Sequence, residues 1–156
     1  MSSFVYGYIE PILSQNKLKS SSDYIKNSKL GIEKISKDWL VHYPDYLIPN
    51  DNIFIFLIGD APGYPNSTYL TDYGEYTPDA DIGFPPDPKE RLNILINTLI
   101  DMITITHASK MVVSMNECDQ IETIKKIKFA EMRDVIHADF AKYQAPPDTL
   151  YEIICE

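Results

Sequence analysis

The sequence is poor in cysteine and glycine, and each shortage excludes a class of protein. Only Cys118 and Cys155 are cysteines among the 156 residues, and neither belongs to a Cys-x-x-Cys pair or to a metal-binding spacing with histidine. We therefore expect two reduced thiols rather than a disulfide framework or a metal site. The chain has six glycines and 44% hydrophobic residues, which is ordinary for a globular domain and excludes fibrous and disordered classes.

Basic residues are also scarce, and no long hydrophobic run is present. Fourteen Lys and Arg residues stand against 23 Asp and Glu residues, which gives a net charge of -9. Because nucleic-acid affinity comes largely from Lys and Arg contacts to phosphates, we expect no nucleic-acid partner and favour a basic protein partner. No stretch approaches the ~18 apolar residues of a membrane span, and the first residues lack a secretion signal. This predicts a cytoplasmic protein that binds no membrane.

The pattern of apolar residues predicts one domain over residues 1–156, of the α/β class, with an α+β arrangement as the alternative. We expect a sandwich in which a mixed sheet of roughly four strands packs against about three helices. The predicted strands are Phe4–Ile9, Ile53–Ile58, Met111–Met115 and Leu150–Cys155, and their order resembles crossover units. Ile53–Ile58 is apolar at every position, which is typical of a central strand covered by helices on both faces.

The three predicted helices differ in the strength of their signals. The helix over residues 88–107 has the clearest start, because Asp87 can cap it, Pro88 suits the first position and Glu90 stands three residues after the cap. A third helix is predicted from about Asp119 to a point before Pro146. The first helix, over residues 22–40, is predicted from apolar residues at helical spacing on either side of Gly31: Ile25, Ile32, Ile35 and Trp39.

The chain carries no recognisable catalytic, cofactor-binding or metal-binding motif. The glycines of Gly59–Gly63 follow a buried strand, but the loop lacks the Lys-Ser or Lys-Thr of a phosphate-binding loop. Asp79 and Asp81 resemble the start of a calcium loop, although no Glu closes it. Three histidines stand far apart in the sequence, at His42, His107 and His137. We therefore predict that the protein is not an enzyme and holds no cofactor or metal.

Residues 60–88 are predicted to form a long loop rich in acidic residues, Tyr and Pro. Residues 51–88 hold seven acidic residues and no Lys or Arg, so this stretch contributes -7 to the net charge. Tyrosine offers a large rigid surface with a polar tip and is enriched at binding hot spots. We predict that the loop binds a basic partner; the alternative is a solvated loop whose tyrosines pack on the core. The predicted partner-binding residues are Asp60, Tyr64, Tyr69, Asp72, Tyr73, Glu75, Tyr76, Asp79 and Asp81.

The opening residues Phe4-Val5-Tyr6-Gly7-Tyr8-Ile9-Glu10, with the small size and low isoelectric point, resemble the immunity proteins of polymorphic or contact-dependent growth inhibition toxin systems in bacteria. The resemblance implies inhibition by binding, in which the protein covers or flanks the active site of a cognate toxin, often a basic nuclease. It implies no role for any individual residue.

Two other functions stay open from the sequence. One is a regulatory or structural interaction protein that forms a homodimer through an exposed apolar helix face. The other is a small enzyme with a pocket near Gly59–Gly63, beside Asp60 and Tyr64, because α/β sheets commonly place ligands at the end of a buried strand.

Overall fold

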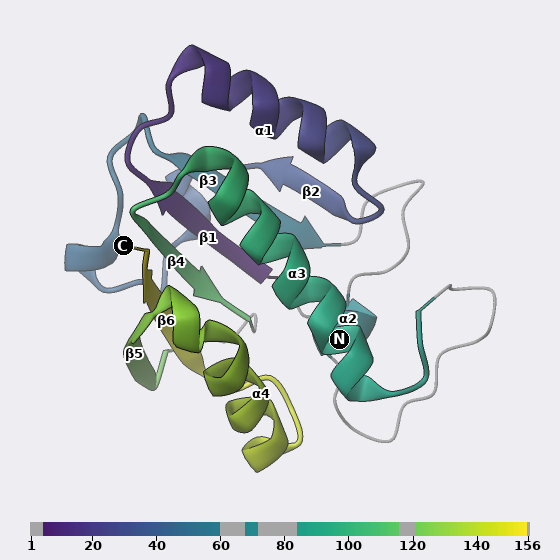
Figure 1. Ribbon diagram of the computed structural model, residues 1–156. Coiled ribbons are helices and arrows are strands. Elements are labelled where there is room, and N and C mark those ends of the chain that lie inside the picture. Colours follow the sequence, from purple (N-terminus) through teal and green to yellow (C-terminus); the bar gives the residue numbers. More distant parts are fainter. Residues whose placement is uncertain (1–4, 60–67, 72–83, 116–120, 156) are drawn as a thin grey trace.

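The computed structural model describes residues 5–59, 68–71, 84–115 and 121–155, and it shows a mixed α/β fold built on one six-stranded sheet (Figure 1). The strand order is β2-β3-β1-β4-β6-β5, and only β5 and β6 are parallel neighbours. The strands are β1 (Val5–Glu10), β2 (Gly31–Lys34), β3 (Phe54–Gly59), β4 (Lys110–Ser114), β5 (Thr123–Lys128) and β6 (Thr149–Ile154).

Three helices of 12 or more residues lie on one face of the sheet (Figure 1). They are α1 (Gln15–Asn27), α3 (Pro88–Thr106) and α4 (Met132–Tyr143), and α2 (Thr68–Thr71) is a single turn beside α3. The main core forms between these helices and the sheet, where Leu95, Leu99 and Phe140 are fully buried against side chains such as Phe56 and Ile153. The helices therefore form one layer and the sheet a second.

The start of α3 follows the sequence signal closely. The Asp87 side chain accepts a hydrogen bond of 3.1 Å from the backbone N–H of Lys89, which satisfies one of the free donors of the first turn. Pro88 occupies the first turn, where the N–H that it lacks would have no helical partner. The helix ends where His107 adopts the left-handed conformation, with φ 51°. The predicted helix over residues 88–107 is thus confirmed.

The mixed α/β class is confirmed, but the sheet has six strands where roughly four were predicted. The two additional strands, β2 and β5, come from segments that the sequence predicted as helix. The predicted helix over residues 22–40 starts seven residues too late, because α1 begins at Gln15, and it is wrong after α1 ends at Asn27. Gly31 begins β2 instead and pairs with Gly59 of β3. The third helix was predicted from about Asp119 to a point before Pro146, but only the part from Met132 to Tyr143, which forms α4, is α-helical. Ile124 and Ile127 have helical spacing, but they lie on opposite faces of β5.

The topology matches the α+β alternative better than a series of crossover units. Four of the five strand pairs are antiparallel, and the parallel pair β5 and β6 is joined through α4. β3 is buried at all six positions, as its apolar sequence predicted, but it lies between β1 and the edge strand β2. The expectation of a central strand with helices on both faces is therefore wrong. Helices cover one face of β3, and a chain segment without α-helix covers the other.

The opening aromatic run forms β1, a central strand, and Gly7 explains how closely it approaches β4. A β-carbon added at Gly7 would collide with the carbonyl oxygen of Val112 and the Cα of Val113, both of which are backbone atoms of β4. The side chains of Tyr6 and Tyr8 point to the face away from the helices. The run is therefore shaped by the packing of the sheet.

Candidate functional site

The face of the sheet away from the helices is covered by residues 35–53, the connection between β2 and β3. This connection contains two short 3-10 helices, η1 (Lys37–Trp39) and η2 (Asp45–Leu47). Three of its side chains, Leu40, Tyr43 and Leu47, are buried against β1, β3 and their neighbours. The connection therefore lies flat on the sheet as a second covering layer, and Ile53 and Pro49 are buried as well.

The outward side chains of this connection include four large apolar residues. We call them the outer ridge: Trp39, Val41, Tyr46 and Ile48, which are 48%, 72%, 74% and 39% exposed. Single exposed apolar side chains are normal on a protein surface, but four within ten residues form a concentration that marks interaction sites. Trp and Tyr are also the residue types that contribute most at protein interfaces. The outer ridge is thus a candidate protein-binding surface.

The outer ridge rests on a fixed support. The Tyr43 hydroxyl donates a hydrogen bond of 2.9 Å to the carbonyl oxygen of Tyr6 and lies 3.3 Å from the hydroxyl of Ser114. At the other end, the Lys37 ammonium group lies 2.7 Å from the Asp51 carboxylate, and this contact raises the pKa of Lys37. Since both partners are exposed, the ion pair contributes little stability. Tyr43 therefore anchors the connection through a buried hydrogen bond, beside the buried side chains of Leu40 and Leu47.

The charged residues of the connection that carries the outer ridge are mostly acidic, with three Asp residues and one Lys. Asp38 and Asp45 are exposed within the same connection, and Lys37 is already paired with Asp51. An apolar centre with a charged rim is the usual arrangement of a protein interface. The sign of this rim agrees with the basic partner that the sequence predicted.

All predicted partner-binding residues lie outside the described residues, apart from the backbone of Tyr69 in α2. The following residues therefore remain predictions from the sequence: Asp60, Tyr64, Tyr69, Asp72, Tyr73, Glu75, Tyr76, Asp79 and Asp81. It does show how the end of the predicted loop is held. The fully buried Arg91 side chain donates hydrogen bonds of 3.1 and 2.7 Å to the carbonyl oxygens of Pro85 and Pro86. The sequence analysis missed this role of Arg91.

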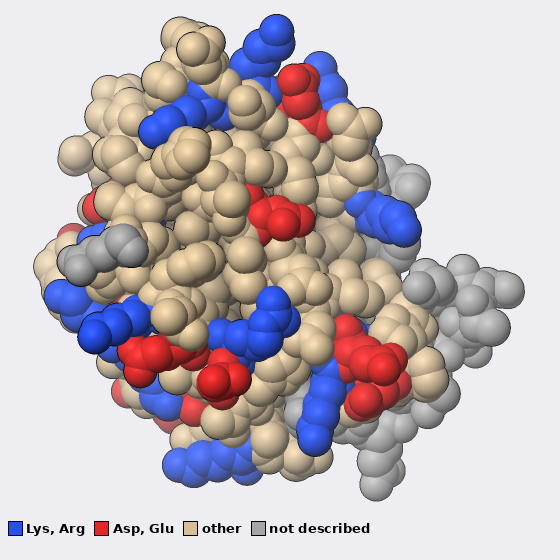
Figure 2. Space-filling view, viewed as in Figure 1, with Lys and Arg blue, Asp and Glu red and all other residues tan. Residues whose placement is uncertain are grey.

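The overall charge divides unevenly along the chain. Eight of the 23 acidic residues and none of the 14 basic residues fall outside the described residues, so the described part holds 15 acidic and 14 basic residues. On the helix face, Figure 2 shows side chains of both signs interspersed over the described elements. The acidic excess therefore belongs to the segments outside the described residues, which include most of the predicted loop.

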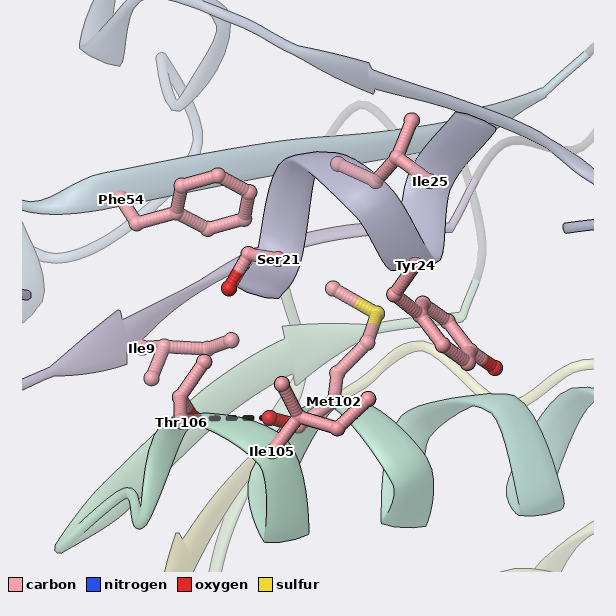
Figure 3. A pocket seen from close by; sticks show the side chains of 8 residues that line it. All are labelled: Ile9, Ser21, Tyr24, Ile25, Phe54, Met102, Ile105 and Thr106. Atoms are coloured by element: carbon pink, nitrogen blue, oxygen red, sulfur yellow. Dashed lines mark hydrogen bonds between the residues drawn. The ribbon is translucent and has the colours of Figure 1, made fainter. Parts of the chain in front are cut away.

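A cavity between α1, α3 and the sheet has a volume of about 10 Å³, lined by residues that include Ser21, Phe54 and Met102 (Figure 3). This volume holds about one water molecule, which is too little for a substrate. The Ser21 hydroxyl is buried there without a hydrogen-bond partner among the described residues. The predicted alternative pocket beside Asp60 and Tyr64 lies outside the described residues.

The structure describes one of the two cysteines and all three histidines. Burial raises the pKa of the Cys155 thiol, which disfavours the nucleophilic thiolate, and Cys118 is not described. In the part of the chain that the structure describes, no group of three His, Cys, Asp or Glu side chains is placed to hold a metal ion. His137 forms a hydrogen bond with the side chain of Asn93.

Comparisons of the chain with protein-family models, with curated proteins and with solved structures found no match. Among the described helices, none combines the length and apolar character required to cross a membrane.

Proposed function

We propose that this protein is a binding module that recognises and neutralises a basic partner protein, in the manner of a bacterial immunity protein that inhibits its cognate toxin. The observation that carries the binding role is the outer ridge of Trp39, Val41, Tyr46 and Ile48. A site of this kind binds by burying rigid apolar side chains against a complementary surface. The inhibitory role and a nuclease-type toxin rest on the sequence resemblance alone.

The charge distribution supports a basic partner. The acidic excess lies outside the described part of the chain, and the rim of the outer ridge carries Asp38 and Asp45. Opposite charges raise the rate of encounter, and the buried apolar contacts then determine how long the complex lasts. We therefore assign affinity to the outer ridge and association rate to the acidic loop.

A pull-down with tagged protein, at low and at high salt, followed by mass spectrometry, identifies the partner. The decisive comparison uses the double variant Trp39→Ala with Tyr46→Ala, and the matched control Tyr143→Ala, which removes an aromatic side chain 57% exposed on α4. Loss of a hot-spot residue costs about 2 kcal/mol or more, which is roughly a 30-fold weaker complex. We expect that loss for the double variant and unchanged binding for the control.

Reversal of the loop charges tests the second half of the proposal. Replacing Asp72, Glu75, Asp79 and Asp81 by Lys should slow association steeply at low salt and leave folding intact. If the ridge variants bind the partner normally and the loop variants do not, the outer ridge is not part of the binding surface. If both sets bind the partner normally, the proposed mode of binding is wrong.

A homodimer is the second candidate function, because the outer ridge is apolar enough for a second copy to cover it. Sedimentation equilibrium separates the two functions. A concentration-dependent dimer that the Trp39→Ala and Tyr46→Ala double variant dissociates would support the homodimer, and a monomer at all concentrations would leave the outer ridge free for a different protein.

A further inference from the structure

A polar groove lies between α3 and α4, on the face of the molecule opposite to the outer ridge. One side comes from α3, where Lys89 and Asn93 are one helical turn apart, and Arg133 and His137 have the same spacing on α4. The groove has a volume of about 480 Å³, and the Asp134 carboxylate lines it as well as the small side chains of Ala138 and Ala141. Most of the helix interface is apolar, so this polar stretch needs its own explanation.

Arg133 is held in position without being neutralised. Its guanidinium group donates hydrogen bonds of 2.8 Å to the Asn93 side-chain oxygen and 2.6 Å to the Asn97 side-chain oxygen. Both acceptors are uncharged amides, and Arg133 forms no ion pair within the described residues. By contrast, Lys125 pairs with the carboxylate of Asp139. The two amides fix the direction of the guanidinium group and leave its full charge, with three of its five N–H donors still available.

His137 shares the same amide. Its Nε2 lies 2.7 Å from the Asn93 side-chain oxygen, and because that oxygen only accepts, Nε2 carries the hydrogen. Partial burial lowers the pKa of His137, and the positive charges of Arg133 and Lys89 lower it further, against the opposing effect of Asp134. These are the charged groups that face the ring from α3 and α4. The positive charges of Arg133 and Lys89 therefore affect the pKa of His137 more than the negative charge of Asp134 does.

We propose that this groove binds an oxyanionic group, a phosphate or a carboxylate, between Lys89, Arg133 and His137. The anion accepts hydrogen bonds from the free N–H groups of Arg133 and is attracted by the Lys89 ammonium group. When His137 takes up a proton, the ring gains a second donor and a positive charge, so binding strengthens as the pH falls. This site is independent of the proposed function, because it shares no residue with the outer ridge or the acidic loop.

The test is an NMR titration of the His137 ring with inorganic phosphate at constant ionic strength, with chloride as the reference salt. We expect saturable shifts of the His137 signals with phosphate and a higher pKa of His137 in the bound state. By linkage, a rise of one unit in that pKa means tenfold tighter binding to the protonated ring. A parallel titration with succinate separates the two sources, since a site that prefers carboxylates binds it more tightly than phosphate.

Two exposed lysines provide a matched pair of variants. Lys89→Gln removes a charge from the groove, whereas Lys142→Gln removes one on the same helix as Arg133 but outside the groove lining. Lys89 makes no ion pair within the described residues, so its loss should not unfold the protein. We expect about tenfold weaker binding for Lys89→Gln and for Arg133→Gln, and no change for Lys142→Gln. No saturation below about 50 mM of either anion, or equal effects of the two lysine variants, would overturn the proposal.

Discussion

The Tyr43 hydroxyl donates a buried hydrogen bond to the backbone carbonyl oxygen of Tyr6, so a side chain of the covering connection is bonded directly to the central strand β1. The two rings stack with their centroids 5.9 Å apart. Burial raises the pKa of Tyr43 far above its usual range, which keeps the hydroxyl protonated as a donor. This contact holds the connection on the sheet and thereby presents the outer ridge to solvent.

Tyr43→Phe removes this donor and keeps the ring. The carbonyl oxygen of Tyr6 then loses a buried partner, so we expect the free energy of unfolding to fall by about 1 kcal/mol. Urea denaturation measures the change. The matched control is Tyr46→Phe, since the exposed Tyr46 hydroxyl can exchange its contacts for water. A loss as large for Tyr46→Phe as for Tyr43→Phe would contradict the anchoring role.

Asp139 joins three elements of the opposite end of the sheet. Its carboxylate lies 2.7 Å from the Lys125 ammonium group of β5 and accepts a hydrogen bond of 2.8 Å from the Tyr151 hydroxyl of β6. We expect Asp139→Asn to lower the free energy of unfolding by about 2 kcal/mol, because the buried carboxylate accepts from both. Lys125→Met should cost about 1 kcal/mol or less, because that side chain is partly exposed. Urea denaturation measures both changes. If the two variants lose the same free energy of unfolding, the ion pair with Lys125 alone accounts for the contribution of Asp139, and the hydrogen bond from Tyr151 adds nothing.

The pH dependence of stability should report on His137. Its pKa in the folded protein lies below the ordinary 6.5, chiefly because of partial burial. As the pH falls through 6.5, His137 binds a proton in the unfolded chain before it does so in the folded protein, which stabilises the unfolded state. The free energy of unfolding therefore decreases between pH 6.5 and the lower pKa of the folded protein. His137→Gln should therefore flatten the fall in stability in this window. Urea denaturation of both proteins across this window measures the change, and an equal fall in stability for His137→Gln and the unchanged protein would contradict the prediction.

The sequence predicted elements with a strong local signal, such as a helix cap or an apolar run, and missed β2 and β5, whose short segments lack one. Residues 88–107 carry their own cap in Asp87 and Pro88, so α3 was predictable. Ile25 and Ile32, by contrast, have helical spacing only by coincidence, because Ile32 belongs to a strand paired with β3. Pairing partners more than 20 residues away leave no local signal.

The candidate site was hidden for a related reason. Residues 42–51 have the composition of turns, and nothing in their local pattern states that they cover a sheet. The buried positions Leu40, Tyr43 and Leu47 alternate with the exposed Trp39 and Tyr46, and this alternation is visible once the sheet is known. The signal was present, but its meaning required the surface on which the segment lies.

β5 is an edge strand, and within the described part of the chain no strand pairs with its outer side. The Thr123 N–H donates to the Asp148 carbonyl oxygen at 3.2 Å, which places the odd-numbered residues of β5 toward β6. In a parallel pair, every second residue directs its backbone N–H and C=O groups to the partner strand and the residues between direct theirs to the other side. The backbone groups of Ile124 and Lys126 therefore face away from β6. The Lys128 N–H donates to the Glu131 carboxylate instead. Lysines at such an edge oppose pairing with a second copy, because like charges would meet.

We therefore expect the double variant Lys126→Val with Lys128→Val to self-associate through β5. The change removes the repulsion between two copies and adds β-branched side chains to a strand of six residues whose pairing is already regular. Sedimentation velocity measures the association, and protection of the Ile124 and Lys126 amides from hydrogen exchange locates it. The control Lys19→Val with Lys26→Val makes the same change of charge on α1, where the backbone groups are bonded within the helix. If the control associates equally, loss of charge alone is responsible, and the edge of β5 has no special part in keeping the protein apart from its own copies.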